Sequence, residues 1–395
     1  MESQRLKISN GKIITADRII SQGVVLVKNG IIEAVEEGEL EVAEALEIDA
    51  QGHYISPGFI DIHVHGGGGH DFMDGTEEAF LEIAKTHVRY GTTAMFPTTL
   101  TSEKKDLLHT LDLYEQASRN NKQGAQLLGM HLEGPYFALS QRGAQDPRYI
   151  RNPDPQEYKE VIAYSTSIKR WSAAPELPGA IAFGQYVTSQ GILVALAHTD
   201  AIYEEVVEAF AQGYTLATHF YSAMSGVTRK NAFRYAGVIE SAYLLDDMDV
   251  EIIADGVHLP APLLKLVYKI KGADKTALIT DAMRGAGMPE GPSILGSKQN
   301  GLAVIIEDGV AKLPDRSSFA GSVATADRLI RSMMQMADVP LVDAIKMATG
   351  TPARIMGIGE RKGSLAIGKD ADIIIFDADI QVQMSMVNGK VVYQQ

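Results

Sequence analysis

The sequence predicts an α/β protein, with a central barrel of eight parallel strands and a small β-domain built from both ends of the chain. Two observations support this prediction. Between residues 58 and 358, short apolar segments alternate with helical segments of roughly ten to fifteen residues, which is typical of βα units in a parallel sheet. Both ends of the chain instead contain short alternating segments joined by Asn-Gly turns. We therefore expect residues 1–57 and 359–395 to form the β-domain and residues 58–358 to form the barrel.

The turns at both ends define the β-domain. Residues 6–14 alternate around Asn10-Gly11, and residues 24–34 alternate around Asn29-Gly30. Residues 371–392 repeat the pattern around a third Asn-Gly pair. Because Asn-Gly is the strongest short hairpin signal, both ends are expected to be antiparallel strands.

Eight segments in the central region have the length and apolar character of buried strands. They are Phe59–His65, Thr92–Thr98, Gln126–Glu133, Arg170–Glu176, Ile192–Thr199, Tyr214–Tyr221, Val250–Asp255 and Ala277–Asp281. Eight is the number that a closed (β/α)8 barrel requires.

Several of these strands end in a side chain that can bind a metal or carry a proton. These residues are His65, Glu133, Glu176, His198, His219 and Asp281. In a barrel, the carboxyl ends of all strands form one face, where active sites lie. An open, doubly wound sheet would not easily bring the first, third, fifth, sixth and eighth strands around one point. The pattern therefore favours the closed barrel.

Composition excludes several classes of function. The 395 residues include no cysteine, which rules out disulfides, thiolate metal ligands and a cysteine nucleophile. The formal net charge of −14 argues against a nucleic-acid partner. No apolar run approaches the length of a membrane span, and the N-terminus lacks the apolar core of a signal peptide. We therefore expect a cytoplasmic protein with neither nucleic acid nor membrane as a partner.

His63 and His65 are the first candidate metal ligands. In a strand, residues two apart point to the same side, so the two imidazoles would project together. Neutral imidazole is the commonest protein ligand of zinc-like metals. The alternative is a pair of histidines at a strand end with no shared role, because short motifs produce many false matches.

Glu133, His198 and His219 close three further strands. A carboxylate in the position of Glu133 can bind one metal or bridge two, although a salt-bridging or capping glutamate is the alternative. His131 precedes it on the same face and is expected one layer deeper, either supporting the ligands or as an ordinary core histidine. His198 and His219 each end an apolar strand, where metal binding would satisfy one ring nitrogen. Buried structural histidines are the alternative reading.

Asp281 and two loop features complete the candidates. Beside a metal, Asp281 could hold the ion and accept a proton from its water, whereas the alternative is a helix cap. His258 lies in a loop and is expected to contact substrate rather than metal. The stretch from residue 209 to 239 is basic around Arg229, Lys230 and Arg234, which makes it the best local anion site unless it is simply solvated surface.

Ten stretches together resemble one known family over nearly the whole chain. They are PGFIDIHVHG, HLEGPYF with RGAQDP, AHTDA, THFYSAMSG, ADGVHLP, LITDAM, FAGS, ATGTPARIMG and GSLAIGKDADIIIFD. This ordered set resembles the N-acetylglucosamine-6-phosphate deacetylases of the amidohydrolase superfamily. The resemblance implies a TIM barrel, a β-sandwich from the two termini and a homodimer.

The same resemblance implies roles for individual residues. Glu133, His198 and His219 would bind one divalent metal, and His63 and His65 a second, giving one or two zinc or iron ions per subunit. Asp281 would contact the metal and act as catalytic acid and base. The implied substrate contacts are Gln145, Ser222, Ala223, Arg234, His258 and Phe319, with Arg234 reaching the phosphate bound by a neighbouring subunit.

The implied reaction is hydrolysis of the acetamide of N-acetylglucosamine 6-phosphate to glucosamine 6-phosphate and acetate, in amino-sugar catabolism. The sequence departs from the family at Ser222, where the family has asparagine, and at Gln145, where some members have histidine. Three alternatives stay open: the galactosamine epimer as substrate, another amidohydrolase such as a cyclic amidase, and an inactive barrel acting as an assembly scaffold. A cyclic amidase would typically carry a modified lysine on the fourth strand, and RWSAAPEL has none at its end.

Overall fold

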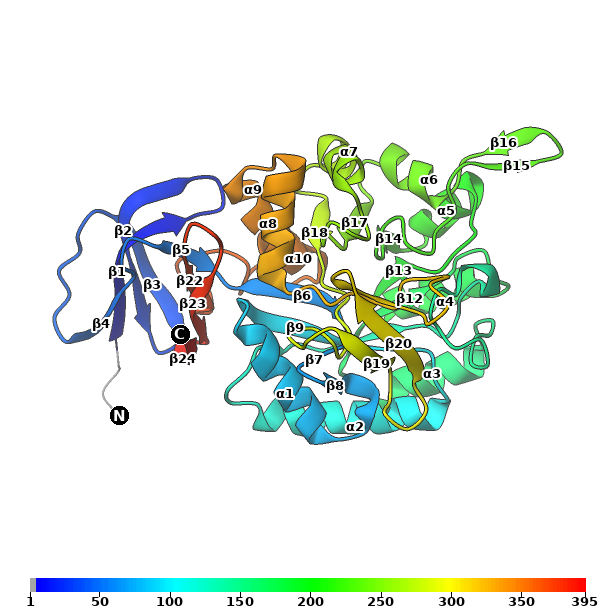
Figure 1. Cartoon of the computed structure of the whole chain (residues 1–395), viewed down its shortest axis with the longest axis horizontal. Helices are drawn as coiled ribbons and strands as arrows, with labels where there is room; N and C mark the ends of the chain where they lie inside the picture. Colours follow the sequence, from blue (N-terminus) through cyan, green and yellow to red (C-terminus); the bar gives the residue numbers. More distant parts are fainter. Residues whose placement is uncertain (1–4) are drawn as a thin grey trace.

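The computed structural model describes residues 5–395, and its larger part is a parallel barrel (Figure 1). The barrel strands are β6 (Phe59–Val64), β9 (Thr92–Thr99), β11 (Met130–Glu133), β12 (Ile168–Ala173), β13 (Leu193–Leu196), β14 (Tyr214–Ala217), β17 (Asp249–Ile252) and β18 (Thr276–Leu278). They follow one another around the sheet in this order, with the two-residue strand β10 (Gln126–Leu127) added beside β9. Backbone hydrogen bonds just beyond the strand ends join the last strand to the first, from Asp281 N to His63 O and from His65 N to Ala282 O, both 2.9 Å.

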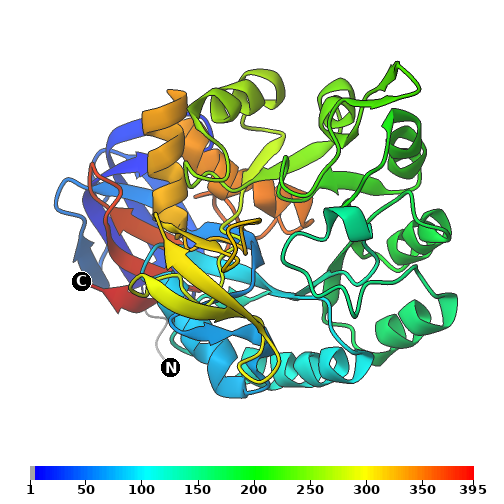
Figure 2. The ribbon, with the colours of Figure 1, turned by 45° about the vertical axis from the view of Figure 1, so that its right-hand side comes forward.

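Helices surround this barrel, as Figure 2 shows from a second direction. They are α1 (Glu77–Val88), α2 (Lys104–Asn120), α3 (Pro155–Tyr164), α4 (Ala180–Ser189), α5 (Tyr203–Ala211), α6 (Val238–Leu244), α7 (Ala261–Lys271), α8 (Ala326–Ala337), α9 (Leu341–Ala348) and α10 (Gly350–Ile355). The apolar faces of α1 to α9 share one large core with the strands, whereas α10 packs with further strand residues in a second, smaller cluster. The predicted (β/α)8 barrel is therefore confirmed.

The two ends of the chain form one small β-domain, as predicted, but the hairpin expected at Asn10-Gly11 was wrong, because this pair forms an irregularity inside one continuous strand, residues 5–14. Its strands are β1 (Arg5–Ile14), β2 (Ile19–Lys28), β3 (Ile31–Glu37), β4 (Ala45–Asp49), β5 (Tyr54–Pro57), β22 (Ile373–Phe376), β23 (Val382–Val387) and β24 (Lys390–Gln394). The antiparallel pair of β5 and β22 joins the N-terminal to the C-terminal strands. Every strand of this β-domain belongs to one hydrogen-bonded sheet of eight, which has its own apolar core.

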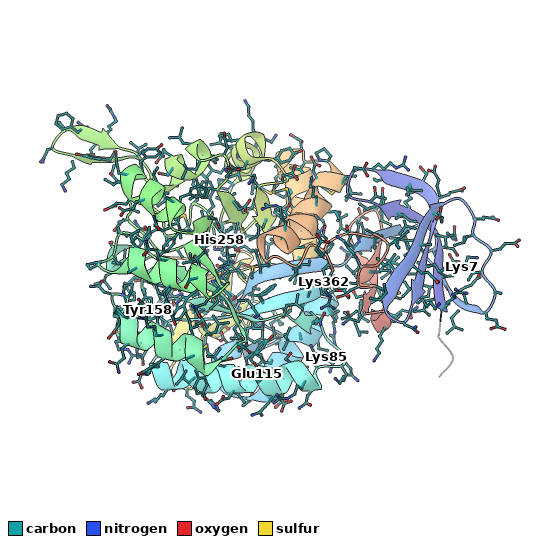
Figure 3. All side chains as sticks on the ribbon, turned by 180° about the vertical axis from the view of Figure 1, so that it is seen from behind. Lys7, Lys85, Glu115, Tyr158, His258 and Lys362 are labelled. Atoms are coloured by element: carbon teal, nitrogen blue, oxygen red, sulfur yellow. The ribbon has the colours of Figure 1, made fainter. Side chains whose placement is uncertain are left out.

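Specific contacts fix the β-domain against the barrel. Lys362, which Figure 3 shows between the two parts, is buried and ties the segment that leaves the barrel to the start of β22: its Nζ lies 3.0 Å from a carboxylate oxygen of Asp370 and 2.5 Å from one of Asp372. Ser385 Oγ on β23 donates to the carbonyl of Val88 at the end of α1, at 2.7 Å. The predicted segment boundaries at 57/58 and 358/359 stay a prediction, and residues 1–4 of the first segment lie outside the described part.

Short β elements that the sequence pattern did not reveal lie around the barrel mouth. Strands β19 (Gly291–Leu295), β20 (Leu302–Glu307) and β21 (Val310–Lys312) form an antiparallel sheet after Asp281. Strands β15 (Thr228–Lys230) and β16 (Phe233–Tyr235) form a hairpin that projects away from the barrel (Figure 1). Strands β7 (Gly66–Gly67) and β8 (His70–Asp71) and the 3-10 helices η1 (Phe72–Asp74) and η2 (Leu139–Gln141) complete the loops. Within residues 5–395, no helix combines the length and apolar character needed to cross a membrane.

Candidate metal centre and substrate pocket

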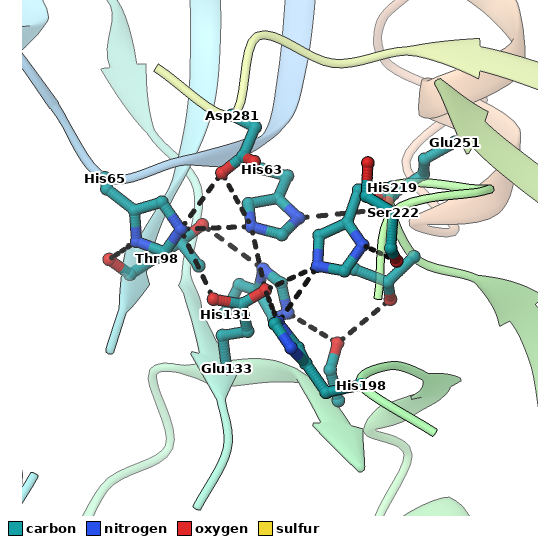
Figure 4. Close-up of polar contacts among 12 residues, drawn as sticks. His63, His65, Thr98, His131, Glu133, His198, His219, Ser222, Glu251 and Asp281 are labelled. Carbon is teal, nitrogen blue, oxygen red and sulfur yellow. Dashed lines mark hydrogen bonds and ion pairs between the residues drawn. The ribbon is translucent and has the colours of Figure 1, made fainter. Parts of the chain in front are cut away.

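His63 and His65 lie at the carboxyl end of β6 with both imidazoles pointing into the barrel mouth (Figure 4). Both side chains are buried, and their Nε2 atoms lie 3.2 Å apart. The His63 Nε2 lies 3.4 Å from Glu133 Oε1, and the His65 Nε2 lies 3.4 Å from Glu133 Oε2. These three residues form one group whose ligand atoms could surround a single cation.

Glu133 also belongs to a second group, with His198 and His219. Its Oε1 lies 3.4 Å from His198 Nε2 and 3.1 Å from His219 Nε2, and these two nitrogens are 3.2 Å apart. Both histidines follow the last residue of their strand by two positions and have left-handed backbone angles, with φ of 47° and 33°. The turn away from the strand therefore aims each imidazole at Glu133. Because Glu133 is shared, the two groups are adjacent and its carboxylate can bridge them.

In these histidines the outer ring nitrogen, Nδ1, faces away from the centre, and its hydrogen bond leaves the imidazole able to act as a ligand. Nδ1 of His65 faces the carbonyl of Thr98 at 3.2 Å, that of His198 faces the carbonyl of Gln141 at 2.8 Å, and that of His219 faces the carbonyl of Ser222 at 3.1 Å. A carbonyl only accepts, so each Nδ1 carries the proton and donates. In the neutral ring this leaves Nε2 with a lone pair directed at the centre, which is the arrangement of a metal-bound histidine.

Charge in the cluster favours a bound cation. Burial alone would lower the pKa of His65, but the carboxylates of Asp281 and Glu133 raise it well above its usual value. Burial would raise the pKa of Glu133, yet the surrounding histidines hold it well below its usual range. The centre therefore attracts positive charge, and its imidazole and carboxylate donors fit a divalent transition metal.

Asp281 lies beside the first group rather than the second. Its Oδ1 is 3.2 Å from His65 Nε2 and 3.4 Å from His63 Nε2. It follows β18 by three residues and has a left-handed backbone angle, with φ of 46°. Despite its burial, which raises the pKa, the neighbouring His63 and His65 hold the pKa of Asp281 below its usual value. The carboxylate is thus ionised and able to accept a proton at the edge of the cluster.

A layer of buried polar side chains supports the centre from inside the barrel. His131, expected one layer below the ligands, places Nε2 2.7 Å from Ser172 Oγ and Nδ1 3.2 Å from Thr98 Oγ1. Burial and the nearby Arg170 lower the pKa of His131 well below its usual value, so this ring is neutral. It packs edge-on against His63, with ring centroids 4.7 Å apart, and so limits the movement of that ligand.

The sequence did not reveal the ion pair between Arg170 on β12 and Glu251 on β17. Both side chains are buried, and Arg170 Nη2 donates to Glu251 Oε2 at 2.8 Å and to Thr218 Oγ1 at 2.7 Å. The same Glu251 oxygen lies 3.7 Å from His63 Nδ1, the one outer ring nitrogen of the four ligand histidines that lacks a hydrogen bond within the described residues. Burial would raise the pKa of Glu251, but Arg170 and His63 lower it. The signal in the sequence that could have indicated this ion pair is a charged residue inside each of two apolar strands.

A pocket of about 480 Å³ opens above the ligands. Five of the six expected substrate contacts line it: Gln145, Ser222, Ala223, His258 and Phe319. His258, whose position near the barrel centre is visible in Figure 3, is fixed by Asp255 Oδ2, 2.8 Å from its Nδ1. The ring of Phe319 lies 4.7 Å from the His258 ring, between centroids. Gln145 Nε2 donates to Glu133 Oε2 at 2.7 Å, so this residue touches the centre itself.

Arg234 is the sixth expected contact, and the structure does not bring it into this pocket. It lies on β16 in the projecting hairpin, exposed, and Arg229 opposes it on β15. A different cation, Arg142, lines the pocket and was not predicted. Its neighbour Gln141 supplies the carbonyl that orients His198, a backbone contact for which the sequence has no signal.

Comparison with known proteins agrees with this architecture. The amidohydrolase family model matches residues 54–392. The N-acetylglucosamine-6-phosphate deacetylase of Lysinibacillus sphaericus is 32% identical, covering 98% of this chain and 97% of the relative. The N-acetylgalactosamine-6-phosphate deacetylase of Escherichia coli O157:H7 is 31% identical, covering 96% and 97%.

Solved structures give the same result. The N-acetylglucosamine-6-phosphate deacetylase of Pasteurella multocida superposes with a TM-score of 0.92 at 27% identity, covering 99% of this chain and 100% of that one. A variant of the Mycobacterium smegmatis enzyme in complex with N-acetyl-D-glucosamine-6-phosphate superposes with a TM-score of 0.90 at 27% identity, covering 100% of both chains. The chain belongs to the amidohydrolase family and, within it, to the N-acetylglucosamine-6-phosphate deacetylases.

Proposed function

We propose that this protein hydrolyses the acetamide of N-acetylglucosamine 6-phosphate, releasing glucosamine 6-phosphate and acetate. One observation carries the proposal: Glu133 joins two groups of ligands at the floor of a pocket, with Asp281 beside them. This arrangement supplies metal ligands and a proton acceptor around one point, as hydrolysis of an unactivated amide requires. The comparisons add that the chain's full-length relatives carry this activity in their names.

The residues that would hold metal are His63, His65 and Glu133 in one group and Glu133, His198 and His219 in the other, with Asp281 at the edge. We propose one or two divalent ions per chain, zinc or iron. A metal in such a site lowers the pKa of a bound water to near 7 and polarises a carbonyl oxygen.

Asp281 and Gln145 have separate roles in the reaction. Asp281 accepts the proton of the attacking water and returns it to the amine that leaves, so that one carboxylate serves as base and then as acid. Gln145 uses one amide N–H to hold Glu133, and we assign its second N–H to the carbonyl oxygen of the acetamide, where negative charge develops.

The sugar phosphate would occupy the side of the pocket formed by Ser222, Ala223, His258 and Phe319. Within one chain, this side lacks the arginine that the family resemblance assigns to the phosphate, because Arg234 is on the projecting hairpin. We therefore propose a homodimer in which Arg234 of each chain reaches the phosphate bound by the other. Phe233, 72% exposed beside it, is an apolar side chain that such contact would cover.

A direct assay tests the proposal. Acetate release should be measured from N-acetylglucosamine 6-phosphate and from its galactosamine epimer, each with metal added. We expect release from the gluco substrate, and its absence from a folded, metal-loaded protein would overturn the proposal. The galactosamine epimer is the second candidate substrate, because a 31% identical relative carries that name. A cytoplasmic location stays a prediction.

A further inference from the structure

A second cavity lies directly behind the substrate pocket. It has a volume of about 260 Å³ and lies between the start of α2, the loop of residues 144–149 and the β19–β20 turn. Met73, Thr101, Thr110 and Leu302 are among the residues that line it, and none of them lines the substrate pocket. The reaction proposed above uses no residue that belongs to this cavity alone.

Four residues line both cavities and therefore form the wall between them: Leu100, Ala144, Gln145 and Leu295. Leu295 is the last residue of β19 and is only 4% exposed, and Leu100 packs against the same apolar cluster. Gln145 is fixed from both sides, since its Nε2 donates to Glu133 at 2.7 Å while its Oε1 accepts from Thr101 N and Oγ1, both at 2.9 Å. The wall is thus one side chain thick and mostly aliphatic.

The order of the barrel strands places this wall at the acyl end of the substrate. Leu100 directly follows β9, the second strand around the ring that starts at β6. Phe319 follows β21, whereas the other residues assigned to the sugar phosphate, Ser222, Ala223 and His258, follow β14 and β17, the sixth and seventh strands. These positions are nearly opposite across the mouth, and the metal ligands lie between them. An amide carbonyl placed at the ligands therefore directs its sugar nitrogen toward Ser222 and His258 and its acyl carbon toward Leu100 and Leu295.

We propose that Leu100 and Leu295, with Ala144 and Gln145, set the size of the acyl group that this protein removes. The wall leaves room for acetyl and blocks longer N-acyl groups, and the cavity behind it is the space that a longer chain enters once the wall is shortened. This inference rests on the proposed deacetylation and names the determinant of its acyl specificity.

The test uses the full chain with metal and three substrates: the N-acetyl, N-propanoyl and N-butanoyl derivatives of glucosamine 6-phosphate. For the native protein we expect kcat/KM to fall about tenfold or more with each added methylene, the usual effect of one methylene in a closed pocket. In Leu295→Ala and in Leu100→Ala, the butanoyl-to-acetyl ratio of kcat/KM should rise about tenfold or more, because the wall opens.

A matched control removes the same number of atoms elsewhere. Leu302→Ala enlarges the second cavity alone, so it should not change the acyl ratio. Hydrolysis of the acetyl substrate by each variant shows that the variant is folded and contains metal. Equal use of butanoyl and acetyl substrates by the native protein, or an unchanged ratio in both wall variants, would overturn the inference. Absence of acetate release by the native protein would instead overturn the proposed function.

Discussion

The two halves of the metal centre are built in different ways. His63 lies on β6 and His65 directly follows its last residue, and their convergence follows from the two-residue repeat of a β-strand. His198 and His219 lie beyond two different strands, in left-handed backbone, and their orientation depends on the carbonyls of Gln141 and Ser222 in the loops. The first half thus depends on the barrel itself, whereas the second depends on the loops that also form the substrate pocket.

The support behind each half differs in charge as well. In the second half, both outer nitrogens face neutral carbonyls. In the first half, His63 faces the carboxylate of Glu251, which Arg170 holds inside the barrel. A negative charge behind an imidazole raises its basicity and strengthens its bond to a cation. Of the two halves, the His63 half therefore has a carboxylate behind one of its imidazoles, whereas the His198 and His219 imidazoles have neutral carbonyls behind them.

The largest expected effect is that of Asp281→Asn, which separates chemistry from metal binding. Asparagine keeps the size of the side chain but cannot accept a proton. We expect turnover to fall by about 10²- to 10⁴-fold, the usual scale for a general acid–base group, while metals bound by His63 and by His198 are retained. Turnover and metal content of the folded variant should be measured together, and near-native turnover would exclude the assigned role.

Arg234→Ala tests a residue that belongs to neither half. We expect kcat/KM for the phosphorylated sugar to fall by about 10- to 150-fold, corresponding to 1.5–3 kcal/mol for a hydrogen bond to a charged group. Activity on the unphosphorylated sugar should barely change, and metal content should not change at all. An equal loss on both sugars would remove Arg234 from the phosphate site.

Mixing the Arg234→Ala protein with the Asp281→Asn protein tests whether Arg234 acts across a dimer. A hybrid dimer would contain one site with both residues intact, so mixing should restore activity. Activity that stays at the sum of the two separate variants, in mixtures shown to exchange subunits, would contradict a contribution from the neighbouring chain.

Glu251→Gln addresses the difference in charge between the two halves. Glutamine can still accept a hydrogen bond from Arg170 but carries no negative charge. We expect metal affinity to fall by about 10- to 100-fold for the ion held by His63 and His65, the usual effect of losing a ligand's supporting partner. The ion held by His198 and His219 serves as the internal control. Calorimetric titration of metal-free protein should resolve the affinities of the two ions. An equal loss of affinity for both ions would contradict the proposed difference in charge between the two halves.

Features that depend on local periodicity were predictable from the sequence. The strand-borne pair His63 and His65 followed from alternation, and all eight barrel strands were found near their predicted positions. Predicted strand ends were too long at His198 and His219, because a left-handed residue leaves the ladder before the ligand is reached.

Features that depend on contacts between distant segments could not be predicted. Arg170 and Glu251 are 81 residues apart and pair across strands that are not neighbours, so neither residue shows its partner in the sequence. The sheet of β19–β21 lies in a region of mixed polarity without a clear strand period, yet it supplies Leu295 to the wall of the pocket. Both features arise only when the barrel closes.

The number of metal ions bound by each chain tests most directly whether the metal centre consists of two halves. Protein purified with excess metal should be compared with a His63→Ala, His65→Ala double variant by elemental analysis. We expect two ions in the native chain and one in the variant, because Glu133, His198 and His219 still form a complete group. A ceiling of one ion in the native protein, unchanged in the double variant, would contradict a centre made of two halves joined by Glu133.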